Sequence, residues 1–237
     1  MKPRSPAQVT CVEDFRQLAR QRVPRMFYDF VDGGSWSEST YRANSADLAE
    51  ILFRPRVGVD ISALSLGARL LGQPATMPVA LAPIGMAGMQ HADGEILAAR
   101  AAERFGVPFT LSTMSVCSIE DVAAATSKPF WFQLYIMKNR AFIERLIARA
   151  RAANCSALVL TLDCQIQGQR HRDIHNGLST PPRPTLRNLA NLATKPGWCL
   201  GCWAPAAAAL ATSSAMSMTC RMSVRSRAGS ASSSTGR

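Results

Sequence analysis

The chain has 237 residues, a formal net charge of +11 and 47% apolar residues. These values fit a globular protein with one large core and argue against a disordered chain. No stretch approaches the roughly 18 apolar residues of a membrane-spanning helix, and the first residues, MKPRSPAQVTCVEDF, lack the apolar segment of a signal peptide. We therefore predict a cytoplasmic protein, with peripheral attachment at the inner face of the cytoplasmic membrane left open.

The first predicted elements are two short helices within residues 12–31. They are separated at Pro24, which suits the first position of a helix. Gly33 and Gly34 end the second helix, and short extended segments follow at FRPRV and ARLLG.

Four apolar strand candidates come next along the chain. They are VALAP from Val79, FTLST from Phe109, FWFQLY from Phe130 and ALVLTLD from Ala157. Helical patterns lie between them, so the alternation predicts right-handed βαβ units and a parallel sheet.

The predicted helices have recognisable ends. Asp93 can cap GEILAARAAERF and Gly106 can end it, while Ser118 and Asp121 form a capping box before VAAAT. Asn139 can cap RAFIERLIARARAA, which has one apolar face.

Two α/β architectures fit this pattern, an open doubly wound sheet and a (β/α)₈ barrel. The turn APIGMAGMQ lacks the GxGxxG spacing of a dinucleotide-binding sheet. Polar residues or a glycine recur instead toward the end of each strand, at Pro83–Gly85, Ser112–Thr113, Gln133 with Tyr135, and Thr161 with Asp163. The active sites of TIM barrels lie at this rim, which favours the barrel.

Several of these motifs together resemble one known family. RVPRMFYDFVDGGSWSESTYRAN, LSTMSVCSIEDVA, WFQLYIMKNR and LTLDCQIQGQRHRD are similar to segments of the FMN-dependent α-hydroxy-acid dehydrogenases and oxidases, with the bacterial L-lactate dehydrogenase branch as the nearest likeness. The resemblance runs from about residue 11 to about residue 200. It implies a TIM barrel, of which the chain holds the N-terminal helices and the first four βα units. It also implies oxidation of L-lactate or a similar L-2-hydroxy acid to the 2-oxo acid, with FMN as cofactor.

The resemblance implies roles for ten residues. The expected cofactor-binding residues are Pro83, Ile84, Gly85, Ser112, Gln133 and Thr161, and the expected substrate-binding residues are Tyr135, Arg170 and Phe30. Phe30 stands where the family usually has a tyrosine. Tyr135 and Asp163 are the expected catalytic residues, Asp163 orienting a catalytic histidine. None of the three histidines, His91, His171 and His175, is in that histidine's position.

Each role has a structural alternative. Gln133 and Thr161 could be satisfied polar groups of the core, Tyr135 a buried strand aromatic, and Arg170 part of a solvated loop. No metal is expected, because arginines flank the His171–His175 pair.

Residues 1–200 are predicted to form the N-terminal half of the barrel, and residues 201–237 an aberrant tail. Of these 37 residues 18 are alanine or serine, and no carboxylate follows Asp173. We favour a shifted reading frame after about Leu200. The alternative is a disordered basic linker. Without the histidine and the phosphate-binding half, negligible turnover is expected of the chain as written.

The partners expected are a small 2-hydroxy acid and an electron acceptor such as a quinone or a cytochrome. The family is often homo-oligomeric, and no nucleic acid is expected. The competing hypothesis is a non-enzymatic fragment whose basic tail, which includes Arg221, Arg225 and Arg227, binds nucleic acid or an anionic membrane.

Overall fold

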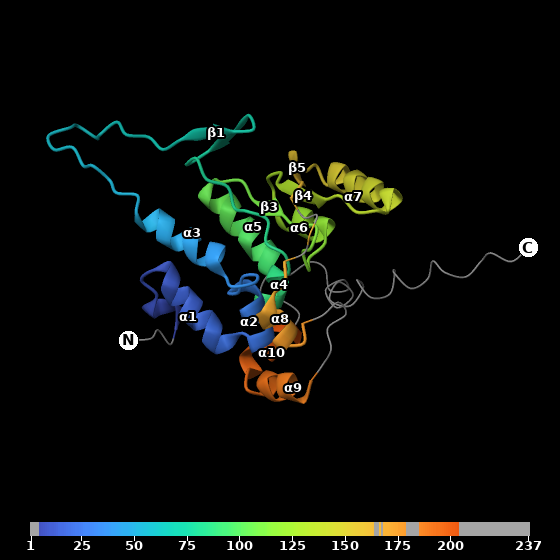
Figure 1. Cartoon of the computed structure of the whole chain (residues 1–237). Coiled ribbons are helices and arrows are strands. Elements are labelled where there is room, and N and C mark those ends of the chain that lie inside the picture. The colour runs from blue at the N-terminus through green and yellow to red at the C-terminus, as the bar shows by residue number, and fades with distance from the viewer. Residues whose placement is uncertain (1–4, 164–165, 167, 179–184, 204–237) are drawn as a thin grey trace, which may run out of the picture. The chain divides into compact units, whose positions relative to one another are not determined.

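A computed structural model describes residues 5–163, 166, 168–178 and 185–203 of the chain (Figure 1). The chain divides into two compact units. The first unit combines Met1–Ser65 with Cys164–Leu200, and the second combines Leu66–Asp163 with Gly201–Arg237. The predicted tail lies outside the described residues from residue 204 onward. The single domain predicted for residues 1–200 stays a prediction.

The first unit is built from helices. They are the 3-10 helix η1 (Pro6–Gln8), α1 (Val12–Arg22), α2 (Arg25–Val31), α3 (Ser39–Ala49), α8 (His171–His175), α9 (Leu186–Ala193) and α10 (Pro196–Trp203), which begins in this unit. The break between the first two helices is confirmed. Pro24 lies at the N-cap of α2 rather than at its first helical position, because its ψ of 138° is extended.

Helices α3, α8, α9 and α10 of the first unit were not predicted from apolar periodicity. The sequence of α3, STYRANSADLA, has Leu48 as its one large aliphatic residue, and the helix buries none of its residues. Residues 171–175 were expected in a loop, but they form the short helix α8. Helix α9 carries a capped N-terminus, where the Thr185 hydroxyl accepts from the N–H of Asn188.

The second unit contains most of the predicted βα pattern. Its elements are β1 (Ala68–Leu70), β2 (Gln73–Ala75), α4 (Ala87–Gln90), α5 (Gly94–Phe105), β3 (Thr110–Leu111), α6 (Ile119–Ala125), β4 (Trp131–Tyr135), α7 (Arg140–Ala152) and β5 (Ala157–Thr161). Strands β1 and β2 form an antiparallel hairpin. Strands β3, β4 and β5 form a parallel sheet in that order, as the alternation predicts.

Two predicted extended segments differ in the structure. VALAP forms only one parallel bridge, between Leu81 and Phe109, because Pro78 and Pro83 bracket it and proline cannot donate to a ladder. FRPRV forms no strand, and Pro55 at its centre removes a donor in the same way. The predicted segment ARLLG does contribute β1.

Helices α5, α6 and α7 lie beside the three-stranded sheet (Figure 1) and share its apolar core. This core includes Ala99, Ala102, Leu111, Ile119, Val122, Phe132, Leu134, Leu146 and Ala150. In the sheet Leu111, Phe132 and Leu158 are in register. Because side chains alternate along a strand, Gln133, Tyr135 and Thr161 belong to the opposite face. The face opposite the helical core therefore carries these three polar side chains.

The predicted helix ends are largely confirmed. Gly106 ends α5 with a φ of +85°, the Ser118–Asp121 capping box begins α6, and the Asn139 side chain accepts from the N–H of Phe142 at the start of α7. Asp93 lies at the N-cap of α5, but its side chain makes no capping bond. Its backbone is left-handed, whereas a capping side chain works from an extended residue.

Candidate active site

Three residues predicted to bind a cofactor meet at the carboxyl ends of the parallel strands. The Ser112 hydroxyl donates to Gln133 Oε1 at 3.2 Å, and Gln133 Nε2 donates to Thr161 Oγ1 at 2.8 Å. Ser112 is 3% exposed and Gln133 is 1% exposed. The chain of bonds therefore crosses from the end of β3 through β4 to β5 and fixes the orientation of the Gln133 amide.

Thr113 adds a second connection at the same place. Its hydroxyl donates to the carbonyl oxygen of Gln133 at 2.5 Å, and its N–H donates to Gln133 Oε1 at 3.2 Å. The N–H of Tyr135 lies 3.3 Å from Thr113 Oγ1, which accepts from it. The predicted residue Tyr135 ends β4 and is half-buried. Thr113 thus sets where β3 ends relative to β4.

The loop Pro83–Gly85 lies against the segment that follows β3. The N–H of Met86 donates to the carbonyl oxygen of Met114 at 2.9 Å. A Cβ added at Gly85 would lie 3.2 Å from the Cβ of Met114, so the two backbones approach closely because residue 85 is a glycine. Pro83 and Ile84 are exposed beside it.

Glu95 supports the same segment and was not predicted. It lies in the first turn of α5, is 2% exposed, and its Oε1 accepts from the N–H of Val116 at 2.9 Å. Its Oε2 is buried without a hydrogen bond among the described residues. A carboxylate at a helix start is usually solvated, so only its burial would have identified it.

Asp163 follows the end of β5 by two residues and is exposed. Its predicted role toward a histidine stays a prediction. His171 and His175 bound the helix α8, and His91 follows α4. None of the three therefore lies at the carboxyl end of β3, β4 or β5.

The predicted substrate residues Arg170 and Phe30 lie in the first unit and contact each other. The guanidinium Cζ of Arg170 lies 5.0 Å from the centroid of the Phe30 ring, a distance typical of cation–π contacts. Arg170 Nη2 also donates to the backbone carbonyl of Phe30. These residues belong to a different unit from Gln133 and Thr161, so their expected meeting at one rim stays a prediction.

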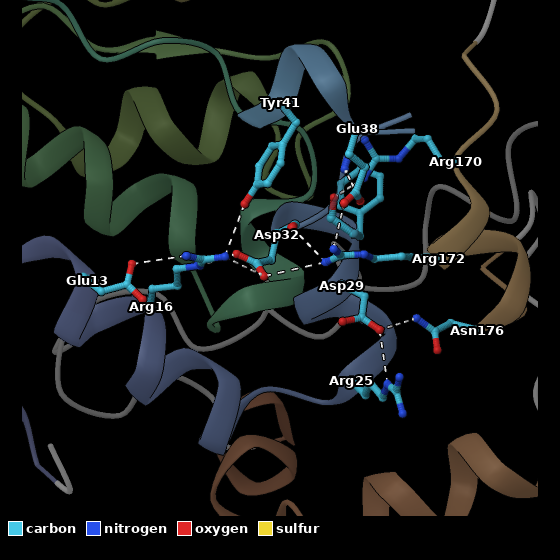
Figure 2. A network of polar contacts seen from close by, with 12 residues as sticks. Glu13, Arg16, Arg25, Asp29, Asp32, Glu38, Tyr41, Arg170, Arg172 and Asn176 are labelled. Carbon is cyan, nitrogen blue, oxygen red and sulfur yellow. Dashed lines mark hydrogen bonds and ion pairs between the residues drawn. The ribbon is translucent and has the colours of Figure 1, made fainter. Parts of the chain in front are cut away.

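A network of charged and polar side chains links helices of the first unit (Figure 2). Arg16 and Arg172 both approach Asp32, with Arg16 Nε at 2.5 Å from Oδ1 and Arg172 Nη1 at 3.8 Å from Oδ2. The hydrogen bonds to Asp32 raise the pKa of Arg16. Burial, with the Asp32 charge, raises the pKa of Tyr28. The network joins segments distant in the sequence through ion pairs whose carboxylates are largely buried and whose arginines remain partly exposed.

Two hollows in the described residues are lined by other groups. A polar cleft of about 440 Å³ in the first unit is lined by Arg16, Arg20, Arg25, Tyr28, Asp29, Asp32, Arg172, His175 and Asn176. A cavity of about 270 Å³ in the second unit touches Phe109, Phe130, Trp131 and Ser156. These four lie at the amino ends of the strands, the opposite end from Ser112 and Thr161.

The residues at the strand ends fit the polar edge of a flavin ring. Ser112, Gln133 and Thr161 supply neutral donors and acceptors on three neighbouring strands, and none of the three carries a charge. Ring heteroatoms of a flavin need such neutral groups in a largely dry pocket. Residue 85 has no side chain where it approaches Met114. The surface at this residue is therefore formed by backbone atoms.

Known proteins give the same indication. Residues 19–230 match the profile of the family described as FMN-dependent dehydrogenase. An L-lactate dehydrogenase of Caulobacter vibrioides (strain NA1000 / CB15N) is 47% identical over 190 residues, which are 80% of this chain and 49% of that protein. One from Xanthomonas campestris pv. campestris (strain B100) is 46% identical over 190 residues, again 80% and 49%. The chain therefore spans about half the length of these relatives.

Solved structures resemble the fold as well. A monotopic membrane protein, (S)-mandelate dehydrogenase, matches 93% of this chain and 60% of its own, with a TM-score of 0.77 and 33% identity. A lactate oxidase of Pediococcus acidilactici matches 78% of this chain and 52% of its own, with a TM-score of 0.69 and 30% identity. The predicted barrel family agrees with both.

Proposed function

Because the chain belongs to the family of FMN-dependent dehydrogenases, we propose that it takes part in the FMN-dependent oxidation of L-lactate or a similar L-2-hydroxy acid. The observation that carries the proposal is the hydrogen-bonded series Ser112–Gln133–Thr161 across three parallel strands. FMN, when bound, accepts the two electrons that leave the hydroxyl-bearing carbon.

The proposed cofactor site uses groups that are neutral and held in place. Gln133 and Thr161 would hold the polar edge of the flavin ring, and the hydrogen bond with Ser112 fixes the orientation of the Gln133 amide in advance. The backbone of Pro83, Ile84 and Gly85 would border the ring. A preorganised polar site of this kind binds without having to order its side chains first.

The proposed substrate groups are Arg170, Tyr135 and Phe30. The Arg170 guanidinium pairs with the substrate carboxylate, which a planar fork of donors suits. The Tyr135 hydroxyl bonds the carboxylate or the hydroxyl oxygen. Phe30 lies under the guanidinium and supplies no hydroxyl of its own. Asp163 is proposed to orient the histidine that would remove the hydroxyl proton. That histidine is none of His91, His171 and His175.

We further propose peripheral contact with a membrane surface. Leu186 and Leu189 are exposed on α9, and Arg187 on the same helix adds positive charge, a combination that favours the interface of an anionic bilayer. The resemblance to a monotopic membrane protein supports this. Among the described residues no helix is long and apolar enough to cross a membrane. The electron acceptor is proposed to be a quinone or a cytochrome.

The test is titration of the purified chain with FMN, followed by anaerobic addition of L-lactate. We expect the fluorescence of FMN to change with saturation, and L-lactate but not D-lactate to shift the flavin absorbance without bleaching it, since negligible turnover is expected of the chain as written. If the purified chain leaves the fluorescence of FMN unchanged, the proposed cofactor site is wrong. FMN binding with equal responses to both lactates would overturn the substrate proposal alone.

A further inference from the structure

Arg170 is held by a carboxylate of its own short helix. Its Nε donates to Asp173 Oδ2 at 2.5 Å, and the two side chains form an ion pair in which Asp173 is 10% exposed. We propose that Asp173 is a positioning residue, which sets the orientation of the Arg170 guanidinium for the substrate carboxylate. This inference rests on the proposed function and deepens it.

Contacts on two further sides complete the hold on Arg170. Its Nη2 donates to the Phe30 carbonyl, and its Cζ stacks over the Phe30 ring at 5.0 Å. Asp173 therefore binds the Nε–H of the Arg170 guanidinium. The Phe30 carbonyl binds Nη2, and the Phe30 ring covers one face of the group. Nη1 makes no hydrogen bond to any described residue, and the side chain remains 29% exposed. A planar group fixed in this way presents one defined edge to an incoming carboxylate.

The neighbouring arginine shows the contrast. Arg172 Nη1 donates to the Asp32 carbonyl at 3.1 Å, and Arg172 Nη2 donates to Glu38 Oε2 at 2.9 Å. Both of its terminal nitrogens are therefore engaged within the unit. Of the two arginines that flank His171, Arg170 has a terminal nitrogen without a hydrogen bond to any described residue, and Arg172 does not.

The burial of Asp173 argues that it does more than stabilise the fold. Its Oδ1 is buried and has no hydrogen bond among the described residues. A buried carboxylate oxygen without a partner costs free energy, and a buried ion pair is weak evidence for stability. Orientation of Arg170 accounts for a carboxylate at this position despite that cost.

The positioning role and a simple charge role predict opposite effects on anion binding. Asp173 carries a negative charge next to the proposed anion site, so its repulsion alone should weaken the binding of an anion. If Asp173 acted only by its charge, Asp173→Asn would bind oxalate more tightly. If Asp173 orients Arg170, the same variant binds oxalate more weakly, because the amide no longer holds the charged Nε–H as firmly.

The first experiment measures oxalate binding to the full chain saturated with FMN, by isothermal titration calorimetry. We expect the Kd of Asp173→Asn to rise about tenfold or more, since small displacements of a binding group have large effects. Glu13→Gln is the matched control, because it removes the carboxylate of the exposed Glu13–Arg16 pair in the same unit. It should leave the Kd unchanged. An unchanged or lower Kd for Asp173→Asn overturns the proposal.

A double variant separates orientation from loss of folding. In an Arg170→Lys background, Asp173→Asn should change the Kd by much less than it does in the original chain, because the fork that it orients is gone. Equal effects in both backgrounds would mean that Asp173 acts through the fold and would overturn the proposal.

A second readout does not depend on FMN or oxalate. In proton–nitrogen spectra of the labelled chain, the Nε–H signal of Arg170 is identified by its loss in Arg170→Lys. Asp173→Asn should speed the exchange of this proton with solvent, while backbone signals report that the chain stays folded. If the original chain binds neither FMN nor oxalate, the proposed function fails, and this signal alone tests Asp173. Unchanged exchange would then overturn the positioning role.

Discussion

Gln133 and Thr161 are 28 residues apart in the chain and are joined by a 2.8 Å hydrogen bond from Nε2 to Oγ1. The bond is diagonal across the parallel pair, because Gln133 is in register with Val159 and Tyr135 with Thr161. Ser112 and the N–H of Thr113 bond the other end of the Gln133 amide. Gln133 is thus the shared member of all these contacts, and it is the most informative residue to change.

Gln133→Met should destabilise the second unit and weaken FMN binding. Methionine has a similar volume but leaves the N–H of Thr113 and the Ser112 and Thr161 hydroxyls without their partner. We expect the free energy of unfolding to fall by about 1–3 kcal/mol and the Kd for FMN to rise roughly tenfold. Urea denaturation and fluorescence titration measure the two. Gln73→Met, on the exposed strand β2, is the control. Wild-type affinity in Gln133→Met would contradict the proposed contact with the flavin.

Phe30→Tyr should strengthen the binding of a substrate carboxylate. The change adds a hydroxyl to the ring that lies 5.0 Å from the Arg170 Cζ. One hydrogen bond to a charged group contributes about 1.5–3 kcal/mol, which corresponds to roughly tenfold or more in affinity. Titration of the FMN-saturated chain with oxalate measures the change. Phe27→Tyr, on the same helix but stacked on Trp198, should have no effect. Equal affinities of Phe30→Tyr and the original chain would show that residue 30 does not reach the carboxylate.

The ion pair between Glu120 and Arg149 should make stability depend on pH in the acid range. Hydrogen bonds from Arg149 lower the pKa of Glu120 from 4.5 to about 2. A lowered pKa means that the contribution is present above about pH 4.5 and is lost as the pH falls toward 2. Both side chains are about half exposed, so the expected contribution is at most about 1 kcal/mol.

The measurement for this pair is the difference in unfolding free energy between the original chain and Glu120→Gln, followed from pH 7 downward. The difference should shrink below about pH 4.5 and vanish only below about pH 2. Glu144→Gln, on α7, serves as a carboxylate control for the same helix pair. A difference that stays constant with pH would show that the pair does not account for the lowered pKa.

Cys155 should resist alkylation at neutral pH. Burial, together with the charge of Glu120, raises the pKa of its thiol to about 11, and the thiolate is the reactive form. Cys11 is exposed and should react sooner with iodoacetamide. Mass spectrometry of the labelled peptides follows both sites over time. Equal labelling of Cys155 and Cys11 in the folded chain would contradict the raised pKa.

The candidate site was predictable in part from local patterns. Ser112 and Thr161 lie where apolar segments end and Gln133 lies within FWFQLY, and parallel strands present their carboxyl ends at one edge, so their proximity followed from the pattern. Thr113 and Glu95 were missed. A threonine beside a strand and an acid in a first helical turn are common, and only their partners in the fold distinguish them. Asp173 could have been noticed through its i, i+3 spacing from Arg170.

The amino-acid sequence by itself determined the alternation of strands and helices, most of the helix ends and the family. These depend on local backbone preferences and on apolar periodicity, which a chain carries without its fold. Tertiary structure decided the rest. It reduced VALAP to a single bridge between Leu81 and Phe109, placed Arg170 against Phe30 across 140 residues, and buried Asp173 beside it. Such contacts depend on which distant groups can satisfy one another's hydrogen bonds once water is excluded, and sequence spacing does not encode that choice.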